Sequence, residues 1–223
     1  MKTLIAIPCM QTVPTPFFKS LLSLQIPVKK EDYVEFTLTE NSLIYDARNV
    51  MANKAVAEGF DRVLWLDSDM VFDPDLYIRL SDWLDMGIEY VSGIYFKRNG
   101  IPHPVIYKRV GFTEKDGEQH PSAEPFISYP EGELFEVAAT GLGGCMMTTG
   151  LIREVKEKFG LPFSPILGFG EDLSFCRRVE EIGKKMYCDS TIRMGHIAHR
   201  VVKESDYRRF LYEQTSTVST GSV

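Results

Sequence analysis

The sequence predicts an α/β protein with a parallel, doubly wound sheet in a single domain. Strand and helix signals alternate over residues 1–96, which is the pattern of such sheets. A chain of 223 residues, 44% hydrophobic and 25% charged, has the size and composition of one soluble globular domain with a sizeable core. Ligands of such sheets gather at the carboxyl ends of the strands, so residues at those ends are the first candidates for function.

The first part of the chain supplies the alternation. The expected elements are strand 3–7, helix 17–24, strand 33–38, helix 41–60, strand 63–66, helix 73–87 and strand 89–96. Asn41 or Ser42 can cap the start of the second helix, and Gly59 suits its end. Asp73 is the expected N-cap of the third helix, with Pro74 at its first position.

The middle of the chain changes character. Residues 97–135 are rich in Pro, Gly, Glu and Lys, and only 104–110 reads as a strand there. Long excursions of this kind in compact domains are usually functional or mobile. A strand, a glycine-rich bend that would let the backbone approach a ligand, a second strand and a helix start follow over 133–152. Another helix is expected from Leu173, and the polar residues 215–223 are expected to form a flexible tail.

Charge and hydropathy exclude two classes of partner. The formal net charge of −6 and the pI near 5.3, without a basic stripe, argue against nucleic acid as the main partner. No stretch approaches the ~18 apolar residues that a transmembrane helix needs, so a membrane span is not expected. The apolar run from Leu4 to Ile7 is too short for a signal peptide and is followed by Pro8.

The cysteines indicate a reducing compartment. Cys9, Cys145, Cys176 and Cys188 show no CxxC spacing and lie in segments that read as buried. They are interpreted as reduced core thiols rather than as a disulfide or a zinc site. The expected location of the protein is therefore the cytoplasm.

The stretch VLWLDSDMVF, residues 63–72, ends an apolar strand in two acids. Asp67 and Asp69 would repel each other unless a cation, solvent or a donor network shares them. Two carboxylates on one tight turn offer hard oxygen ligands to Mg²⁺ or Mn²⁺ and leave positions for phosphate oxygens. The alternative is a solvated turn at a strand end.

Glu171 and Asp172 open a predicted helix after Gly170. Acids in a first helical turn complement the helix dipole and can cap it, which is a purely structural explanation. A carboxylate held there by backbone donors is also well placed to act as a general base. The string GED alone leaves both explanations open.

Histidines and basic residues add further candidates. His196 and His199 follow a predicted strand, but no matching pair of ligands elsewhere would make them a zinc site. One neutral imidazole could complete a metal shell begun by a carboxylate. Lys97 and Arg98 could face a diphosphate or simply water, and Arg48 lies on the helix before the acidic strand.

Together these segments resemble the GT-A-type glycosyltransferases, in particular the family 2-like enzymes of bacteria and phages. The similarity spans roughly residues 3–200, and each motif is short, so the order and separation of the motifs supply the specificity. The matching elements are Ile7-Pro8, Ala47-Arg48-Asn49, Asp67-Ser68-Asp69, GLGGCMMTT, GEDLSFC and Gly195-His196. The resemblance implies a GT-A fold, with a mixed, mostly parallel central sheet flanked by helices.

The resemblance also implies substrates and roles. It implies a nucleotide-sugar donor, with a UDP-sugar favoured, a Mn²⁺ or Mg²⁺ ion on the diphosphate, and a hydroxyl acceptor. Asp69 and His196 would be metal ligands, and Asp67 would contact the ribose or a metal-bound water. Asp172 matches the base of inverting members, and Glu171 would orient the acceptor or its partner loop. The residues implied for the nucleotide pocket are Ile7, Pro8, Arg48, Asp67 and Ser68.

By the same resemblance, the expected domain, 1–214, divides by role. Residues 1–96 would be the nucleotide-binding half, 97–135 the variable excursion on the acceptor side, and 136–214 the acceptor and catalytic half. The chain has no QxxRW element, which argues against a processive polysaccharide synthase. The acceptor, the choice between inversion and retention, and the oligomeric state stay open.

Two other functions stay in competition. A sugar-phosphate nucleotidyltransferase also uses metal-binding acids on an α/β sheet, but it begins with a glycine-rich basic loop where this chain has PCMQTVPTP. A non-catalytic nucleotide-sugar or glycan-binding protein could keep the fold. The joint presence of Asp69, Asp172 and His196 favours an enzyme over such a binder.

Overall fold

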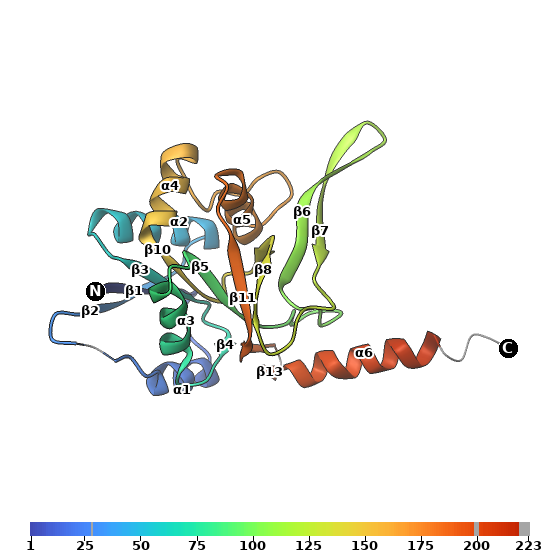
Figure 1. The fold of residues 1–223 in the computed structure, drawn as a ribbon, viewed down its shortest axis with the longest axis horizontal. Coiled ribbons are helices and arrows are strands. Elements are labelled where there is room, and N and C mark those ends of the chain that lie inside the picture. The colour runs from blue at the N-terminus through green and yellow to red at the C-terminus, as the bar shows by residue number, and fades with distance from the viewer. Residues whose placement is uncertain (28, 199–200, 219–223) are drawn as a thin grey trace.

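The computed structural model of the protein describes residues 1–27, 29–198 and 201–218. Its centre is a seven-stranded sheet (Figure 1). The strands lie in the order β2 (Tyr33–Thr39), β1 (Lys2–Pro8), β3 (Arg62–Leu66), β10 (Gly144–Thr148), β5 (Tyr90–Ile94), β11 (Met186–Arg193) and β8 (Leu134–Val137). The strands expected in the first 96 residues are therefore all present, with small shifts at their ends.

The sheet is mixed, and most of its strands run in one direction. β2 and β3 pair in parallel with β1, and β11 pairs in parallel with β5. β10 is antiparallel to both β3 and β5, and β8 is antiparallel to β11. The mixed, mostly parallel sheet is confirmed. The strands expected from the alternation over 1–96, β1, β2, β3 and β5, run parallel to one another, and β10 lies antiparallel between β3 and β5.

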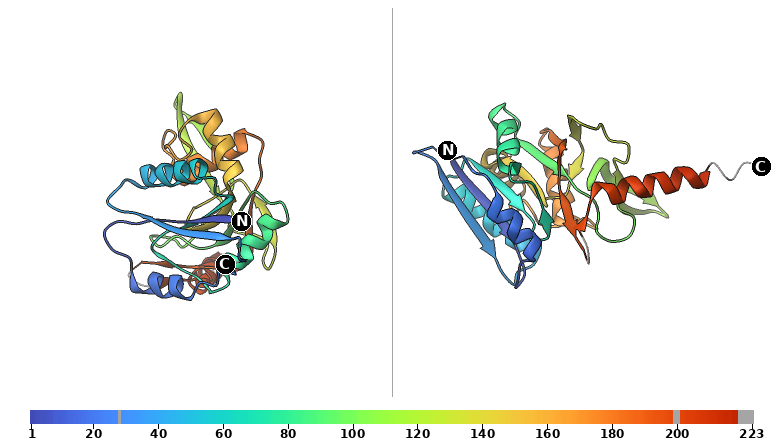
Figure 2. Two further views of the ribbon diagram at one scale, coloured as in Figure 1. Left: turned by 90° about the vertical axis from the view of Figure 1, so that its left-hand side faces the viewer. Right: turned by 90° about the horizontal axis from the view of Figure 1, so that it is seen from below.

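Helices cover both faces of the sheet (Figure 1, Figure 2). One face packs against α2 (Ile44–Ala57), α4 (Thr149–Phe159) and α5 (Glu171–Glu181), and the other against α1 (Thr15–Ser23) and α3 (Leu76–Asp85). Alternate residues of a strand point to opposite faces of the sheet. In β1, Leu4 and Ala6 pack on the side of α2, α4 and α5, and Ile5 and Ile7 pack on the side of α1 and α3. All four side chains are fully buried, as expected for a central parallel strand.

Two predicted helix starts are wrong by a few residues. α2 begins at Ile44 without a side-chain cap, so neither Asn41 nor Ser42 acts as its N-cap. α3 begins at Leu76, after the expected cap, because the carbonyl of Asp73 accepts a hydrogen bond from the Leu76 N–H at 3.2 Å in a preceding turn. Turn-forming residues alone did not distinguish the turn from the helix that follows it.

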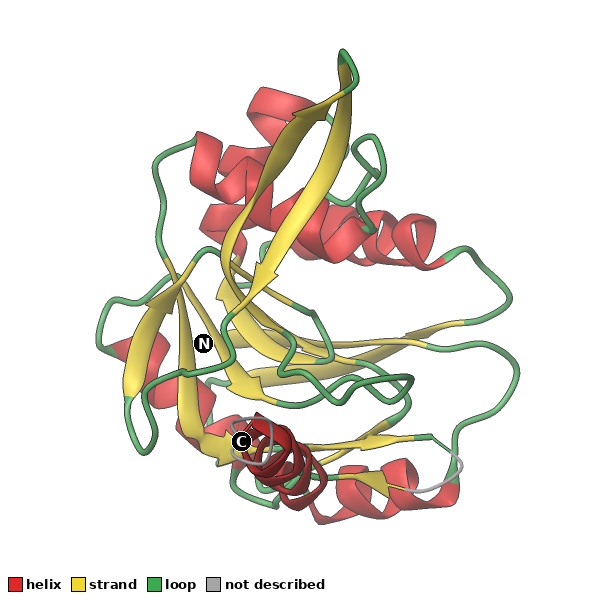
Figure 3. Cartoon of the chain, turned by 90° about the vertical axis from the view of Figure 1, so that its right-hand side faces the viewer, coloured by secondary structure: helices red, strands yellow, loops and turns green. Residues whose placement is uncertain are grey.

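The excursion over 97–135 contains a long hairpin rather than a single strand. β6 (Ile106–Lys115) and β7 (Glu118–Pro125) pair in antiparallel fashion, and β9 (Ala139–Thr140) extends the pair to a three-stranded sheet. Asp116 and Gly117 form the turn, with φ of 55° and 81°, a left-handed geometry that suits these two residue types. The hairpin projects from the body of the protein (Figure 1, Figure 3).

A second small sheet lies beside the end of β3. It contains β4 (Met70–Val71), β12 (Gly195–Ile197) and β13 (Val201–Val202), all antiparallel to their neighbours. In this sheet His196 pairs with Met70, the residue that follows Asp69. Two short strands thereby bring a late histidine to the acidic turn.

The last helix, α6 (Glu204–Val218), was not predicted from the sequence. It extends away from the body (Figure 1) and includes residues 215–218 of the expected flexible tail, while 219–223 lie outside the described residues. Its first turn is anchored by Tyr207, which is 2% exposed and stacks on Phe96 at 4.8 Å between ring centroids. The Tyr207 hydroxyl donates to the Ile127 carbonyl at 2.5 Å.

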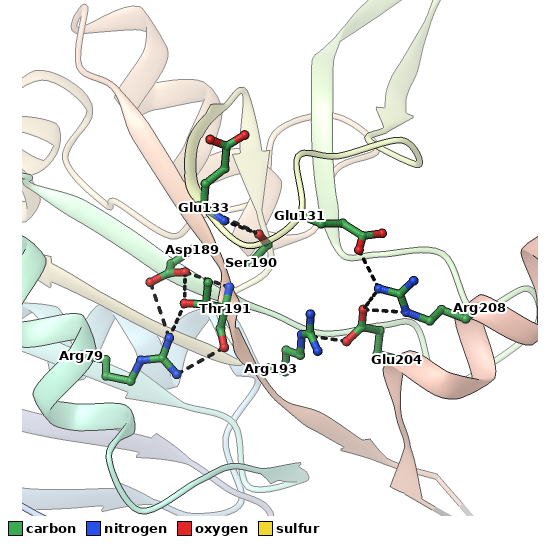
Figure 4. Close-up of polar contacts among 9 residues, drawn as sticks. All are labelled: Arg79, Glu131, Glu133, Asp189, Ser190, Thr191, Arg193, Glu204 and Arg208. Carbon is green, nitrogen blue, oxygen red and sulfur yellow. Dashed lines mark hydrogen bonds and ion pairs between the residues drawn. The ribbon is translucent and has the colours of Figure 1, made fainter.

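Ion pairs also fix the start of α6 (Figure 4). Glu204 lies 2.8 Å from Arg193 Nε on β11 and 2.7 Å from Arg208 Nη2 in the next helical turn. Arg208 Nη2 also contacts Glu131 at 2.7 Å. The helix is therefore joined both to the central sheet and to the segment before β8.

The four cysteines are free, as the sequence predicts. Cys145, Cys176 and Cys188 are buried, but Cys9 is only half-buried at the end of β1, so its assignment to the core is wrong. Within the described part of the chain, none of the helices has the length and apolar character that crossing a bilayer requires.

Candidate active site

The candidate active site lies at the carboxyl ends of β1, β3 and β5, the edge of the sheet where the acidic motif was predicted to lie. Asp67, Ser68 and Asp69 form a tight turn between β3 and β4. Two backbone hydrogen bonds fix it: the Asp67 N–H donates to Gly143 at 3.1 Å, and the Asp69 carbonyl accepts from Ile197 at 2.8 Å. The turn is therefore held from both sides rather than free in solvent.

Two side chains converge on one oxygen of Asp69. His196 Nε2 lies 3.4 Å from Asp69 Oδ2, and the Arg98 guanidinium forms an ion pair with the same oxygen. His196 Nδ1 is 2.9 Å from the Phe96 carbonyl, which can only accept, so Nδ1 carries a proton. Nε2 therefore faces Asp69: when protonated it donates to the carboxylate, and when neutral its lone pair is available to a cation placed between the two side chains.

The surroundings of Asp69 favour its charged form. Burial acts to raise the pKa of Asp69, but the hydrogen bond with His196 and the charges of His196 and Arg98 outweigh it and lower the pKa below its ordinary value. Asp69 is therefore a carboxylate at neutral pH, the form that binds a cation.

Asp67 is held by a buried arginine. Arg48 on α2 is 1% exposed; its Nη2 donates to Asp67 at 2.6 Å and its Nε to Glu171 at 3.2 Å. Burial raises the pKa of Asp67, and the charge of Arg48 opposes this without cancelling it. Arg48 and Ile7, both expected in the nucleotide pocket, are buried, so their side chains present almost no surface to a ligand.

Replacing Arg48 with methionine is expected to lower the free energy of unfolding by about 3 kcal/mol, because Asp67 and Glu171 lose the cation that they share. Urea denaturation followed by circular dichroism measures the change. Arg109→Met is the matched control: it breaks an exposed pair with Glu124 and should cost less than about 1 kcal/mol. Equal losses in the two variants would contradict the bridging role of Arg48.

Asp172 occupies the first turn of α5 and differs from its neighbour. Its Oδ1 accepts a hydrogen bond from the Leu173 N–H at 2.7 Å. Burial, followed by the nearby charge of Glu171, raises the pKa of Asp172 to about 6. Gly170 is the N-cap, so neither acid is the N-cap residue, but both lie in the first helical turn, and Asp172 accepts from one of its free N–H groups. A carboxyl group with a raised pKa in a cleft is a candidate general base.

Two clefts meet at the acidic turn. One, of about 300 Å³, lies between the end of β1 and the start of α2 and is lined among others by Pro8, Ser42, Ser68 and Asp69. The other, of about 400 Å³, is lined among others by Asp69, Tyr95, Lys97, Asp172 and His196. Asp67, Asp69 and Arg98 border both clefts, so a ligand could extend from one into the other.

A divalent cation fits the residues present, with few protein ligands. Among the described residues, no group of three or more His, Cys, Asp or Glu side chains is arranged to hold a metal. Asp69 and His196 provide one carboxylate and one imidazole from neighbouring elements, while Asp67 is engaged by Arg48. Hard cations that take phosphate or water as further ligands are often bound by so few side chains. His199, the other candidate histidine, lies outside the described residues.

The glycine-rich bend serves a different purpose from the one expected. A Cβ on Gly141 would lie 1.9 Å from Tyr95 Oη, and one on Gly144 would lie 2.3 Å from Met194 Sδ. The Gly143 N–H donates to Tyr95 Oη at 3.2 Å. Gly141 and Gly143 thus make room for Tyr95 in the larger cleft, and Gly144 makes room for the buried Met194. Sequence reasoning missed Tyr95, whose only signal was an aromatic residue at the end of a predicted strand.

Comparisons with known proteins find similarity in structure alone. No protein-family model matches the chain, and no curated protein matches its sequence. Protein A197 from STIV aligns with a TM-score of 0.58 and 21% identity over 89% of this chain and 86% of that one. GalNAc-T7, in a structure with UDP, GalNAc and Mn²⁺, aligns with a TM-score of 0.55 and 13% identity over 95% of this chain and 47% of that one.

The third similar structure is TarS 1-349 from S. aureus, with a TM-score of 0.52 and 13% identity over 100% of this chain and 67% of that one. GalNAc-T7 and TarS are glycosyltransferases, and this chain has a fold similar to the GT-A fold of such enzymes. At these identities the likeness is one of fold, so the chemistry has to be argued from the site itself.

Proposed function

We propose that the protein is a metal-dependent glycosyltransferase that moves a sugar from a UDP-sugar to a hydroxyl acceptor. The observation that carries the proposal is the convergence of Asp69, His196 and Asp172 on one cleft, which meets a second cleft at the acidic turn. The GT-A-like fold supports it, as does the presence of UDP and Mn²⁺ in the GalNAc-T7 structure.

The smaller cleft is the proposed nucleotide pocket. It lies at the carboxyl end of β1, beside Pro8 and Ser42, where ligands of open α/β sheets bind. Its far wall is the turn containing Ser68 and Asp69, which would place the diphosphate at the border of the two clefts. The sugar would then lie in the larger cleft, within reach of Asp172.

Asp69 and His196 are the proposed protein ligands of the cation. One carboxylate and one imidazole suit Mn²⁺ better than Mg²⁺, which strongly prefers oxygen ligands. When bound, the ion supplies positive charge that stabilises the charge developing on the leaving diphosphate. Phe96 keeps the His196 ring in position through the bond to Nδ1.

Asp172 is the proposed general base. An acceptor hydroxyl in the larger cleft gives its proton to the Asp172 carboxylate while its oxygen bonds to the anomeric carbon, and the bond from that carbon to the diphosphate oxygen breaks with its electron pair. With Glu171 and Asp67 paired to Arg48, a single displacement with inversion is the reaction that these residues support. A pKa of about 6 keeps Asp172 ionised at neutral pH, yet more basic than an ordinary aspartate.

Calorimetric titration of UDP and GDP, each with and without Mn²⁺, tests the proposal. The expected result is micromolar UDP binding that requires Mn²⁺ and weaker or no binding of GDP. UDP-sugar hydrolysis or transfer in the presence of Mn²⁺ then distinguishes an enzyme from a non-catalytic binder. Well-folded protein that binds neither nucleotide in Mn²⁺ would overturn the proposed site, and pyrophosphate release from a nucleoside triphosphate would favour a nucleotidyltransferase.

A further inference from the structure

Arg98 lies where it competes with a cation for Asp69. Its guanidinium pairs with Asp69 Oδ2, the same oxygen that faces His196 Nε2 at 3.4 Å. An arginine side chain stays positively charged at any working pH. A divalent cation bound by Asp69 and His196 would meet this charge at close range, and like charges so near each other repel.

The ion pair between Arg98 and Asp69 can separate without a change in the fold. Arg98 is 46% exposed, and the exposed segment 97–100 joins β5 to β6. The base of that segment is fixed, because the Lys97 N–H donates to the His103 carbonyl at 2.9 Å and Phe96 forms a bridge with Pro104. The Arg98 side chain can therefore swing away from Asp69 without any movement of the strands.

A phosphate would give the displaced guanidinium a new partner. Arg98 borders both clefts, next to the position proposed for the diphosphate. A planar guanidinium forms paired hydrogen bonds with phosphate oxygens, so the exchange of a carboxylate for a diphosphate keeps the charge compensated. Arg98 would then be neutralised in both states, by Asp69 in one and by the donor in the other.

We propose that Arg98 competes with the metal ion for Asp69. Binding of the nucleotide diphosphate draws Arg98 away from Asp69, and this exchange couples cation binding to donor binding. This inference rests on the proposed function. It assigns to Arg98 two opposite effects: it weakens cation binding to the free protein and strengthens the complex with nucleotide. Because coupling between two ligands is reciprocal, the same residue makes UDP binding more dependent on the metal.

Mn²⁺ titration monitored by the electron paramagnetic resonance signal of the free ion tests the proposal, with and without UDP. Without UDP, Arg98→Gln is expected to bind Mn²⁺ roughly five-fold more tightly than the unsubstituted protein, the fold-change that loss of a competing exposed ion pair allows. With UDP, the advantage should disappear or reverse. Arg109→Gln removes the same charge from an exposed ion pair that borders neither cleft and should change Mn²⁺ affinity less than about two-fold.

Each other outcome has a definite meaning. Equal or weaker Mn²⁺ binding by Arg98→Gln in the absence of UDP would overturn the competitor role. Equal tightening in Arg109→Gln would overturn it too, because it would indicate a general charge effect. In these cases Mn²⁺-dependent UDP binding would leave the proposed function standing. Absence of Mn²⁺ binding by all three proteins, with and without UDP, would overturn both proposals. Circular dichroism checks that the variants are folded.

Discussion

Replacing Asp69 with alanine is expected to abolish Mn²⁺-dependent UDP binding in a protein that stays folded. Asp69 supplies the carboxylate of the proposed metal pair, and His196 alone would be a weak site. Loss of a residue that only supports a metal ligand typically costs about 10- to 100-fold in affinity, so loss of the ligand itself should cost at least about 100-fold. Calorimetry of UDP in saturating Mn²⁺ measures the effect.

Asp73→Ala is the matched control for this variant. It removes the same charge from an exposed side chain just beyond β4 and should leave UDP affinity unchanged. The two thermal transitions should be similar, because the Asp69 side chain is only partly buried, Arg98 is free to turn to solvent, and the backbone hydrogen bond from Ile197 to the Asp69 carbonyl remains. Undiminished Mn²⁺-dependent binding in Asp69→Ala would refute the assignment of the metal ligand.

Replacing Asp172 with asparagine is expected to lower the transfer rate by about 10²- to 10⁴-fold while leaving UDP and Mn²⁺ binding intact. Asparagine keeps the shape of the side chain but cannot take a proton from the acceptor. In the unsubstituted enzyme, the rate should rise with pH through about 6 and then level off, because the base works only when it is ionised. A rate profile without that step, or full activity in Asp172→Asn, would exclude Asp172 as the base.

The same substitution should change stability by an amount that depends on pH. The folded pKa of Asp172, about 6, lies above its ordinary value of 3.8, so the folded state holds the proton more tightly than the unfolded state. That contribution is fully present below pH 3.8 and is lost as the pH rises through 6. Above pH 6, the unsubstituted protein must bury an ionised carboxylate at this position and the variant buries a neutral amide. Asp172→Asn should therefore be more stable than the unsubstituted protein by up to about 3 kcal/mol. Denaturation at pH 3 and pH 8 measures both limits.

The strands of the central sheet could be predicted from the sequence because each central strand is marked by its own apolar run. The continuous apolar runs of β1 and β3 predict strands buried on both faces, and the structure buries Ile5, Trp65 and Leu66 completely. The acidic turn after β3 could be located for the same reason. The direction of β10 could not, because the residues of a strand do not reveal from which end the chain enters the sheet.

The contacts within the site were less predictable because they join distant segments through weak local patterns. His196 comes beside Asp69 through β4 and β12, which are too short to show a strand period. β7 is polar and contains two prolines, and it becomes a strand only by pairing with β6. The burial of Arg48 between Asp67 and Glu171 was also not predictable, because it depends on α2 and α5 meeting behind the site.

The stacking of Tyr207 on Phe96 has a consequence for the order in which the protein matures. The Phe96 carbonyl accepts a hydrogen bond from His196, and the Phe96 ring is supported by the ring of Tyr207 on α6, late in the sequence. During synthesis, the sheet through β11 could form while Phe96 still lacks this partner. A nascent chain would therefore form the proposed nucleotide pocket first and a firmly oriented His196 last, so the proposed metal site would be complete only once Tyr207 is in place.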